Sequence, residues 1–368
     1  MEPIPFLSLA PQHALIQDAV TESLKNSFEK NWYILGDDLK KFEAEYARFS
    51  NVDYCFGVGN GYDALSIALR ACDVGSGDEV IVPAHTYVAT WLAISNCEAS
   101  IVPVEPEADT MLIDPKKIEN VITSKTKVIL PVHLYGYPCN MTLLDEIARR
   151  HSLKIVEDNA QAHGAAWNNK PTGSFGIASA TSFYPTKNLA ALGDGGAVTT
   201  NDKLIADFIR RYRNYGFERK NYCEIQGINS RLDELQARVL SIKLARLNEW
   251  NQQRRDLAGL YTERLKGISD VDIPVVPKEA FAVYHLFVIR TSQRDKLKKY
   301  LEVSGIETMI HYPVPPHLQK AYATLDLKKD LPLTERIATT VLSLPLWPGL
   351  QTSQVDYICD RIKTFFSR

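Results

Sequence analysis

Closely paired cysteines are absent from this sequence. Its six cysteines are scattered along 368 residues with no C-x-x-C pair, which argues against a metal site of the zinc type and against a dense disulfide framework. Apolar runs of membrane-spanning length are also missing, and the N-terminal segment lacks the basic and apolar regions of a secretory signal. We therefore expect a cytoplasmic protein without a membrane partner, in which most cysteines are small buried apolar residues.

An excess of charge of either sign is missing too. Lys and Arg total 42 and Asp and Glu total 44, which gives a formal net charge of −2. This balance offers no general attraction for nucleic acid or an anionic membrane, so any phosphate-bearing ligand must be held by local groups. The composition, 45% hydrophobic and 23% charged, is that of a folded globular protein with one large core and a smaller one.

From about Tyr54 to Thr200, short segments rich in Val and Ile alternate with segments of helical periodicity. This alternation is typical of βαβ units, so we predict an α/β fold with a mostly parallel sheet between helices. The predicted strands are YCFGV, DEVIVP, SIVPV, KVILPVH, LKIVED, ATSFY and GGAVTT, and the predicted helices include DALSIALRAC and MTLLDEIARRH.

The pattern changes at Asn229. Residues 229–265 contain no Pro and a single Gly, which predicts one long helix or two joined helices. Beyond them, AVYHLFVIR, IETMIHY and VLSLPL resemble strands, and SQRDKLKKYLEVSG and SQVDYICDRIKTFF resemble helices. We expect a large domain over residues 1–250 and a small α+β domain over residues 251–368.

One lysine stands out by its surroundings. Lys187 lies in TSFYPTKNLAALGDGGAVTT, among apolar and aromatic residues and before a Gly-rich turn. A free lysine has a pKa of about 10.4 and is almost wholly protonated at neutral pH. An apolar pocket would lower the pKa and make the amine a nucleophile. The alternative is an ordinary surface lysine in a loop.

A carboxylate ends the strand-like segment LKIVED, where an α/β sheet usually opens to ligands. Asp158 is the candidate, and Glu157 is the alternative. Side chains alternate along a strand, so only one of the two is expected to face a site. A role for Asp158 in capping the following turn is also open.

Two further features follow predicted strands. In FGVGNGYDALSIALR, a glycine-containing turn places Gly61 and Tyr62 at a helix N-terminus, which favours an anion. The same turn could belong to a nucleotide-binding Rossmann fold, although the third glycine of G-x-G-x-x-G is missing. In PAHTYVATW, Tyr87 could offer an aromatic surface, or could simply belong to the core.

Together these features match what pyridoxal phosphate (PLP) requires: a lysine for the Schiff base, an anion cradle, a carboxylate for the pyridinium nitrogen and a surface for the ring. The segments EDNAQAHGA, SFYPTKNLAALGDGGAV, GINSRLDELQA and IHYPVPPHLQKAY occur in an order that resembles the DegT-like family of sugar-nucleotide aminotransferases. The resemblance covers nearly the whole chain. It implies PLP-dependent fold type I and a homodimer whose active sites are shared between subunits.

The resemblance also implies roles for individual residues at the cofactor. Lys187 would hold PLP and shuttle a proton, Asp158 would face the pyridinium nitrogen, and Tyr87 would lie on the ring. Gln161 would approach the phenolic oxygen side. The phosphate would be held by Gly61, Tyr62, Ser182 and, from the neighbouring subunit, Asn229. Tyr62 departs from the small hydroxyl residue of many members, but its backbone N–H can still serve. Some members of the broader family have His at the lysine position and act as dehydratases, and Lys187 argues against that branch.

The sequence at Asn60–Asp63, Phe183–Pro185 and His311–Pro313 most resembles the subgroup that aminates C3 of dTDP-linked 3-keto-6-deoxyhexoses. By that likeness the hexose would meet Tyr184, His311, Tyr312 and the partner chain's Lys220, and Arg254 could meet the diphosphate. We expect glutamate as the amino donor and a product used in surface polysaccharide or glycoconjugate. The alternatives are amination at C4 of a 4-keto sugar, and a nucleotide-binding regulatory protein without PLP chemistry.

Overall fold

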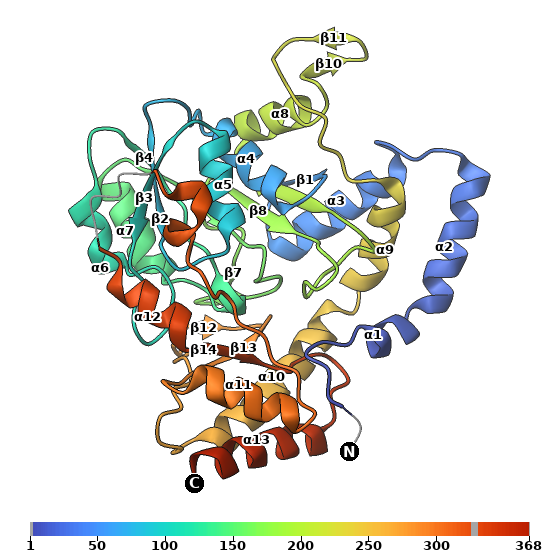
Figure 1. Ribbon diagram of the computed structural model, residues 1–368. Coiled ribbons are helices and arrows are strands. Elements are labelled where there is room, and N and C mark those ends of the chain that lie inside the picture. The colour runs from blue at the N-terminus through green and yellow to red at the C-terminus, as the bar shows by residue number, and fades with distance from the viewer. Residues whose placement is uncertain (1–2, 325–329, 368) are drawn as a thin grey trace.

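A seven-stranded sheet lies at the centre of the protein (Figure 1), whose computed structural model describes residues 3–324 and 330–367. Its strands are β1 (Tyr54–Val58), β2 (Glu79–Pro83), β3 (Ser100–Val104), β4 (Thr126–Ile129), β5 (Lys154–Asp158), β8 (Ala178–Ser182) and β9 (Gly196–Thr200). They are ordered β1-β9-β8-β5-β4-β2-β3; β9 runs antiparallel to β1 and to β8, and the other neighbouring pairs are parallel. All seven coincide with predicted strands, which confirms the α/β class.

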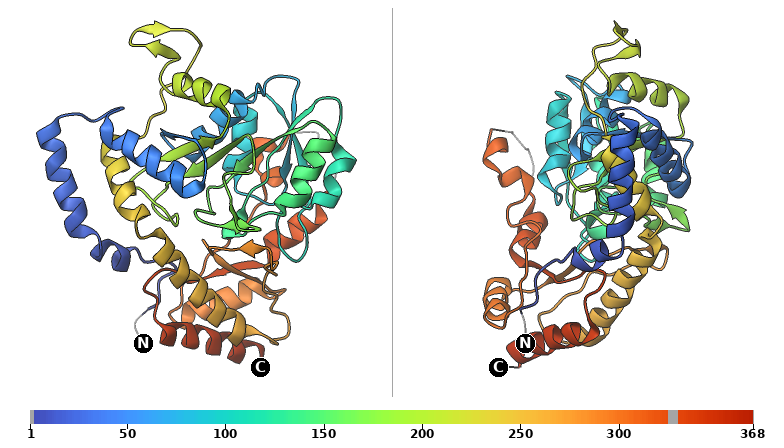
Figure 2. Two further views of the ribbon diagram at one scale, coloured as in Figure 1. Left: turned by 180° about the vertical axis from the view of Figure 1, so that it is seen from behind. Right: turned by 90° about the vertical axis from the view of Figure 1, so that its right-hand side faces the viewer.

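Helices cover both faces of this sheet (Figure 2), which explains why its strands are rich in Val and Ile. They include α3 (Asp37–Ser50), α4 (Gly61–Ala71), α5 (Val88–Asn96), α6 (Pro115–Ile118), α7 (Met141–Arg150) and α8 (Lys203–Tyr212). Asparagine side chains define two starts. Oδ1 of Asn60 accepts from the N–H of Asp63 at 2.8 Å, and Oδ1 of Asn140 accepts from the N–H of Leu143 at 3.2 Å. The two helices begun there, α4 and α7, confirm the predicted ones.

The predicted helical stretch from Asn229 forms two helices, α9 (Glu234–Leu244) and α10 (Leu247–Leu265). α10 runs from the sheet into the C-terminal part of the chain (Figure 1). There β13 (Phe287–Arg290) pairs antiparallel with β14 (Val341–Leu344), beside α11 (Arg294–Val303), α12 (Pro332–Thr340) and α13 (Thr352–Phe366). These elements confirm the two strands and two helices predicted around residues 282–305 and 341–366.

The predicted strand IETMIHY is wrong. Within residues 306–312 the pairing consists of isolated bridges, from Ile306 to Ile4 and from Met309 to Ser343. The physical reason is that His311 and Tyr312, which follow these bridges, line a cavity described below. An alternating apolar pattern therefore belongs here to a segment that lies beside β14 on one side and faces the cavity on the other.

A second core lies at the C-terminal end. Leu257 and Tyr261 from α10 pack there with Phe287, Leu297 and other apolar side chains. Ile4 joins the same core, and its N–H donates to the carbonyl of Gly305 at 2.7 Å. The start of the chain thus packs against its C-terminal part. The predicted boundary near residue 250 falls in α10 and stays a prediction.

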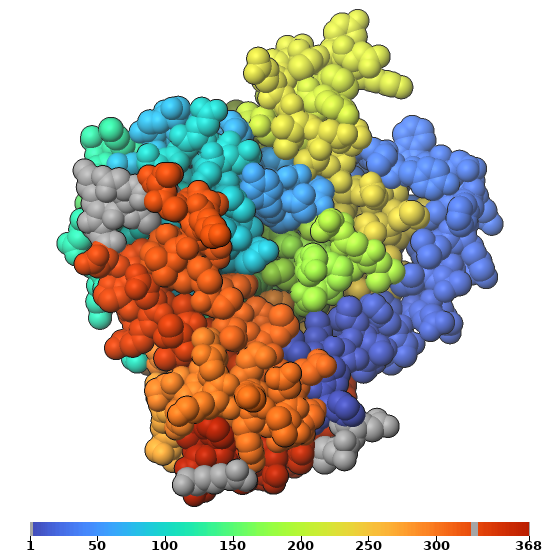
Figure 3. All heavy atoms as spheres, in the orientation of Figure 1, coloured from blue at the N-terminus to red at the C-terminus, as the bar shows by residue number. Residues whose placement is uncertain are grey.

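The remaining elements are short or peripheral. A hairpin of β10 (Phe217–Arg219) and β11 (Tyr222–Cys223) projects from the body, and α1 (Ala10–Ala14) and α2 (Gln17–Lys30) extend along one side (Figure 3). The rest are β6 (Ala166–Trp167), β7 (Lys170–Pro171), β12 (Ala280–Phe281), η1 (Glu119–Val121), η2 (Leu134–Gly136), η3 (Pro316–Leu318) and η4 (Lys320–Tyr322). Five of the six cysteines are buried, as expected, and Cys223 is exposed. Over the described ranges, the structure contains no helix with the length and apolar character to cross a membrane.

Candidate active site

A cavity of about 830 Å³ opens where several strands of the large sheet end. It receives side chains from the turn after β1, the segment after β2, the end of β5 and the loop after β8. The predicted site residues that line it are Gly61, Tyr62, Tyr87, Asp158, Gln161, Ser182, Tyr184, Lys187, His311 and Tyr312. Residues as far apart in sequence as Gly61 and Tyr312 therefore meet at one place, at the edge of the sheet where α/β proteins bind ligands.

Lys187 is held by a tight turn after β8, in which its N–H donates to the carbonyl of Tyr184 at 2.8 Å. The side chain is half-buried, and its amine lies in the cavity. Loss of water around the amine lowers the pKa of Lys187 to about 8, because burial disfavours the charged form, and the negative charge of Asp158 opposes that shift. A substantial neutral fraction near pH 7 to 8 is what a nucleophilic amine requires.

Asp158 and Glu157 point to opposite sides of β5, as the alternation of side chains predicts. Asp158 lies in the cavity, where its Oδ2 accepts from the Thr90 hydroxyl at 2.9 Å and its Oδ1 from the N–H of Ala160 at 3.1 Å. Burial raises the pKa of Asp158, and these hydrogen bonds and the charge of Lys187 act against that rise. The amine of Lys187 and the carboxylate of Asp158 therefore lie in one cavity, and each favours the charged form of the other.

Glu157 faces the core instead. Its carboxylate accepts from the N–H groups of Gly173, Phe175 and Gly176 at 2.7 to 2.9 Å, and it pairs with Nε2 of His133 at 3.0 Å. Burial alone would raise the pKa of Glu157, but these partners outweigh it and hold the pKa below its ordinary value. Every oxygen of this acid is satisfied, so its role is structural.

The N-terminus of α4 opens into the same cavity and is a fit for a phosphate. A Cβ on Gly61 would lie 2.5 Å from Cβ of Ser182, so only glycine lets the helix start this close to β8. The free N–H groups and the positive end of the helix dipole lie beside the Ser182 hydroxyl there, and all three can bind an anion. The side chain of Tyr62 packs against the main core, which leaves its backbone N–H for an anion.

Two tyrosine rings and one amide form another wall. The Tyr87 ring is 51% exposed and its centroid lies 5.1 Å from that of Tyr312. The Tyr312 hydroxyl accepts from Nε2 of Gln161 at 3.1 Å, and Oε1 of Gln161 accepts from the N–H of Tyr135 at 2.6 Å. The orientation of Gln161 is therefore determined by its two partners.

The segment bearing His311 is tied to the large sheet. The hydroxyl of Tyr135 donates to the carbonyl of His311, and it lies 2.8 Å from Nε2 of His85. Since a carbonyl can only accept, the single hydroxyl proton goes to His311, and His85 must donate. Nδ1 of His311 lies 2.8 Å from the Ser343 hydroxyl, and burial lowers the pKa of His311 to about 4, so its ring is neutral.

Three predicted residues lie outside the cavity. Lys220 is exposed in the projecting hairpin, and Asn229 is exposed and donates to the Tyr215 hydroxyl at 2.7 Å. Arg254 is only 2% exposed, and its Nη1 donates to the carbonyls of Tyr284, His285 and Leu346. The expected contact between Arg254 and a diphosphate is not supported by this placement, because its guanidinium serves the backbone within the core.

Several residues of the cavity were not predicted from the sequence. Thr90 follows Tyr87 on the first turn of α5, and its helical spacing from Thr86, whose hydroxyl lies 3.0 Å away, is a signal that could have found it. Asp194, His285 and Glu307 also line the cavity. His285 and Glu307 come from segments that a local pattern does not connect with the large sheet.

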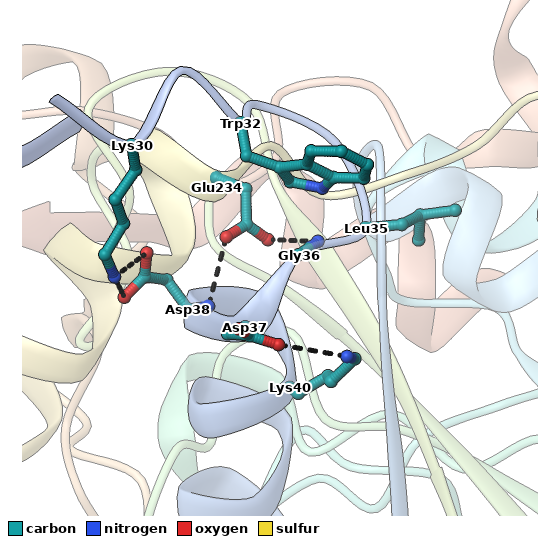
Figure 4. Close-up of a pocket in the computed structure, with 8 residues that line it drawn as sticks. All are labelled: Lys30, Trp32, Leu35, Gly36, Asp37, Asp38, Lys40 and Glu234. Atoms are coloured by element: carbon teal, nitrogen blue, oxygen red, sulfur yellow. Dashed lines mark hydrogen bonds and ion pairs between the residues drawn. The ribbon is translucent and has the colours of Figure 1, made fainter. Parts of the chain in front are cut away.

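A separate cavity of about 250 Å³ at the start of α3 differs in kind (Figure 4). Glu234 accepts there from the N–H groups of Gly36, Asp38 and Leu39 at 2.8 to 3.1 Å. Its carboxylate occupies the helix N-terminus that an external anion would otherwise take. This arrangement caps a helix, and the catalytic features meet in the larger cavity.

The comparisons with known proteins agree with this site. A model of the DegT/DnrJ/EryC1/StrS aminotransferase family matches residues 14–363. The chain is 45% identical to dTDP-3-amino-3,4,6-trideoxy-alpha-D-glucose transaminase of Streptomyces venezuelae, over 99% of this chain and 97% of that protein. It is 46% identical to dTDP-3-amino-3,6-dideoxy-alpha-D-galactopyranose transaminase of Aneurinibacillus thermoaerophilus, over 98% and 99%. The crystal structure of S. venezuelae DesV in complex with a ketimine intermediate matches with a TM-score of 0.98 at 44% identity, over 100% of both chains.

Fold and site together define an aminotransferase with PLP as its cofactor. The donor set fits that group: a lysine of lowered pKa, a buried carboxylate, a helix N-terminus beside a hydroxyl, and an aromatic wall. The chain belongs to the DegT/DnrJ/EryC1/StrS aminotransferase family.

Proposed function

We propose that this enzyme transfers an amino group from an amino acid, L-glutamate, to C3 of a dTDP-linked 3-keto-6-deoxyhexose. The observation that carries the proposal is the convergence of Lys187 and Asp158 on one cavity beside the N-terminus of α4. The names of the two relatives, both transaminases of dTDP-linked 3-amino sugars, support the substrate. A cytoplasmic location and a product used for surface polysaccharide or glycoconjugate belong to the same proposal.

The cofactor would be held at four points. Lys187 would form the covalent link, Gly61, Tyr62 and Ser182 would hold the phosphate, and Tyr87 would lie on the ring. Asp158 would keep the pyridine nitrogen protonated, since a buried carboxylate strongly favours a cation beside it. When bound, PLP supplies an electron sink for the carbon that loses its proton.

Lys187 would have a second task. A group whose pKa is about 8 can both accept and release a proton near neutral pH. Its Nζ is tethered in the cavity, and no other Lys or Arg lines this cavity among the described residues. Lys187 would therefore take up and return the proton that must move in a transamination.

The sugar would lie at the mouth of the cavity. Tyr184 is 52% exposed there, and His311 and Tyr312 line the wall. The neutral His311 ring can accept or donate a hydrogen bond to sugar hydroxyls without attracting an anion of its own.

We further propose that the enzyme is a homodimer with shared sites. Lys220 is exposed between β10 and β11, on the hairpin that projects from the body of the subunit (Figure 1). Phe28 and Trp32 are 71% and 62% exposed, beside the exposed Tyr33 and Ile34, which is unusual for a free surface. Lys220 and Asn229 would thus complete the partner's cavity.

A hybrid experiment tests the shared site. K187A and K220A subunits are each expected to be nearly inactive alone. Mixed and re-assembled, they should regain activity, because one site of each hybrid dimer keeps both lysines. No recovery in verified hybrid dimers would contradict the contribution of Lys220 across the interface.

The position of amination is tested with a panel of 3-keto and 4-keto nucleotide sugars, with the product read by NMR. We expect the new amine at C3 and little turnover of the 4-keto substrates. Amination at C4 would favour the alternative substrate. A purified protein that stays colourless after incubation with PLP would favour a regulatory protein instead.

A further inference from the structure

Three buried side chains, those of Asn251, Asn188 and His285, are linked by hydrogen bonds, and Asn188 directly follows Lys187. Nδ2 of Asn251 donates to the carbonyl of His163 at 2.8 Å, so its Oδ1 is left to accept. It accepts from Nδ2 of Asn188 at 2.9 Å, and this same Nδ2 also donates to the carbonyl of Val283 at 3.1 Å. Since backbone carbonyls can only accept, the orientation of both amides is determined.

The chain ends at a histidine and determines where its proton lies. Nδ1 of His285 is 3.3 Å from Oδ1 of Asn188, an atom that has no hydrogen to give. Nδ1 must therefore carry the hydrogen of the ring. Burial lowers the pKa of His285 well below its ordinary value, and the charges of Lys187 and Arg254 act in the same direction. The ring is neutral, and its Nε2 carries a lone pair and no hydrogen.

His285 lines the same cavity as Lys187. Its Nε2 has no hydrogen-bond partner among the described residues. It is also not one of their fully buried polar atoms, so a group in the cavity can approach it. The other titratable groups at the cavity are Asp158, Asp194, Glu307, His311 and the tyrosines Tyr62, Tyr87, Tyr184 and Tyr312. Lys187 is the one cation that lines this cavity in the described chain, and it directly precedes Asn188. An acceptor without a partner and a cation with hydrogens thus share one space.

We propose that His285 is a positioning residue for Lys187: the two side chains share the cavity without a hydrogen bond in the structure, and the unprotonated Nε2 accepts a hydrogen from Nζ when the lysine side chain turns toward it. In the neutral amine, the bond would turn the lone pair of Nζ toward the reacting atoms. In the ammonium form, it would stabilise the charge. The Asn251 and Asn188 amides would act through His285 by holding its tautomer. The inference rests on the proposed role of Lys187 in holding the cofactor.

The tautomer is tested first, in the complete protein with [15N]histidine. The resonance of His285 is identified by its loss in H285Q. We expect Nδ1 to show the shift of an N–H nitrogen and Nε2 that of a bare nitrogen, with and without PLP. A hydrogen on Nε2, or on both nitrogens, would overturn the inference, and this result does not depend on the activity of any variant.

The contact with Lys187 is tested by the pH dependence of lysine acetylation with acetic anhydride in cofactor-free protein, read by mass spectrometry. Loss of an acceptor removes support for the ammonium, so H285L should lower the midpoint for Lys187 by about half to one pH unit. H285Q keeps an acceptor oxygen and should stay close to wild type. In the loaded enzyme, H285L should lower kcat about tenfold or more and change KM little.

Lys243 is the internal reference in the same samples. It is buried in α9, and burial lowers its pKa to about 8, as for Lys187, but it lies outside the cavity. A shift at Lys187 alone supports the proposal. An unchanged Lys187 midpoint in folded H285L, or an equal shift at both lysines, would overturn it. Failure of the proposed function is seen separately, as retention of covalently held PLP by K187A.

Discussion

The hydroxyl of Thr90 donates to Oδ2 of Asp158, with 2.9 Å between the oxygens, inside the cavity that contains Lys187. The bond links the first turn of α5 to the end of β5 and orients the carboxylate. It also favours the charged form of Asp158 against the effect of burial. The carboxylate of Asp158 is thus oriented by a neighbouring side chain that was not among the predicted site residues.

Replacing Thr90 with Val removes this hydroxyl and preserves the shape of the side chain. A hydrogen bond to a charged group contributes about 1.5 to 3 kcal/mol, so T90V should weaken PLP binding or lower kcat by about tenfold to a hundredfold. Both are measured by titration with PLP and by steady-state kinetics. T262V is the matched control, because the Thr262 hydroxyl bonds only to the carbonyl of Ala258 in its own helix. Equal behaviour of the two variants would contradict the role of Thr90.

Glu157 should affect stability and not chemistry. Its pKa is held below the ordinary value of 4.5, so its contribution is fully present above that value and is lost as pH falls through the lower folded-state pKa. E157Q should lose about 3 kcal/mol of unfolding free energy at pH 7. Below about pH 4 the difference from wild type should shrink. Denaturant unfolding at several pH values measures it. A pH-independent difference, or loss of kcat in folded E157Q, would speak against this assignment.

Gly61 should be intolerant of even one methyl group. The Cβ of G61A would meet Ser182 at 2.5 Å, so α4 must shift away from β8 and its N–H groups must leave the phosphate position. We expect PLP affinity to fall by about tenfold or more, since several hydrogen bonds are displaced together. G259A is the control: a Cβ there meets nothing within 4 Å, and alanine should stabilise α10 by up to about 1 kcal/mol. Similar PLP affinities of wild type and G61A would refute the cradle.

Arg254 distinguishes a substrate contact from a structural role. Its Nη1 donates to three backbone carbonyls within the core. R254M should therefore lower the free energy of unfolding by about 2 to 4 kcal/mol, while KM for the nucleotide sugar in the folded fraction stays within about threefold of wild type. A large rise in KM with unchanged stability would restore the diphosphate contact that the sequence suggested.

The sequence predicted what local patterns encode. Segments rich in Val and Ile were sufficient for the seven strands and a period of 3.6 for α4 and α7, and the ends of β5 and β8 place Asp158 and Lys187 in one cavity. Side-chain alternation correctly separated Asp158 from Glu157. These features depend on backbone geometry within a few residues, which sequence reading resolves well.

Contacts between segments that are far apart in the chain could not be predicted from the sequence. The segment of His311 reads as a strand, but the Tyr135 hydroxyl and the cavity define its path. His285 depends on Asn188 and Asn251, which are 97 and 34 positions away in the chain, and its tautomer follows from carbonyls on yet other segments. The buried position of Arg254 follows from how α10 packs against the C-terminal core. Such contacts arise only when distant segments meet.

We propose that Lys187 holds PLP opposite Asp158, and K187A tests this role most directly. The measurement combines the visible absorption of enzyme loaded with PLP and the rate of amino transfer to the 3-keto sugar. We predict that K187A loses the absorption of lysine-bound PLP and that its rate falls by about a thousandfold or more. A wild-type spectrum and rate in K187A would contradict the account.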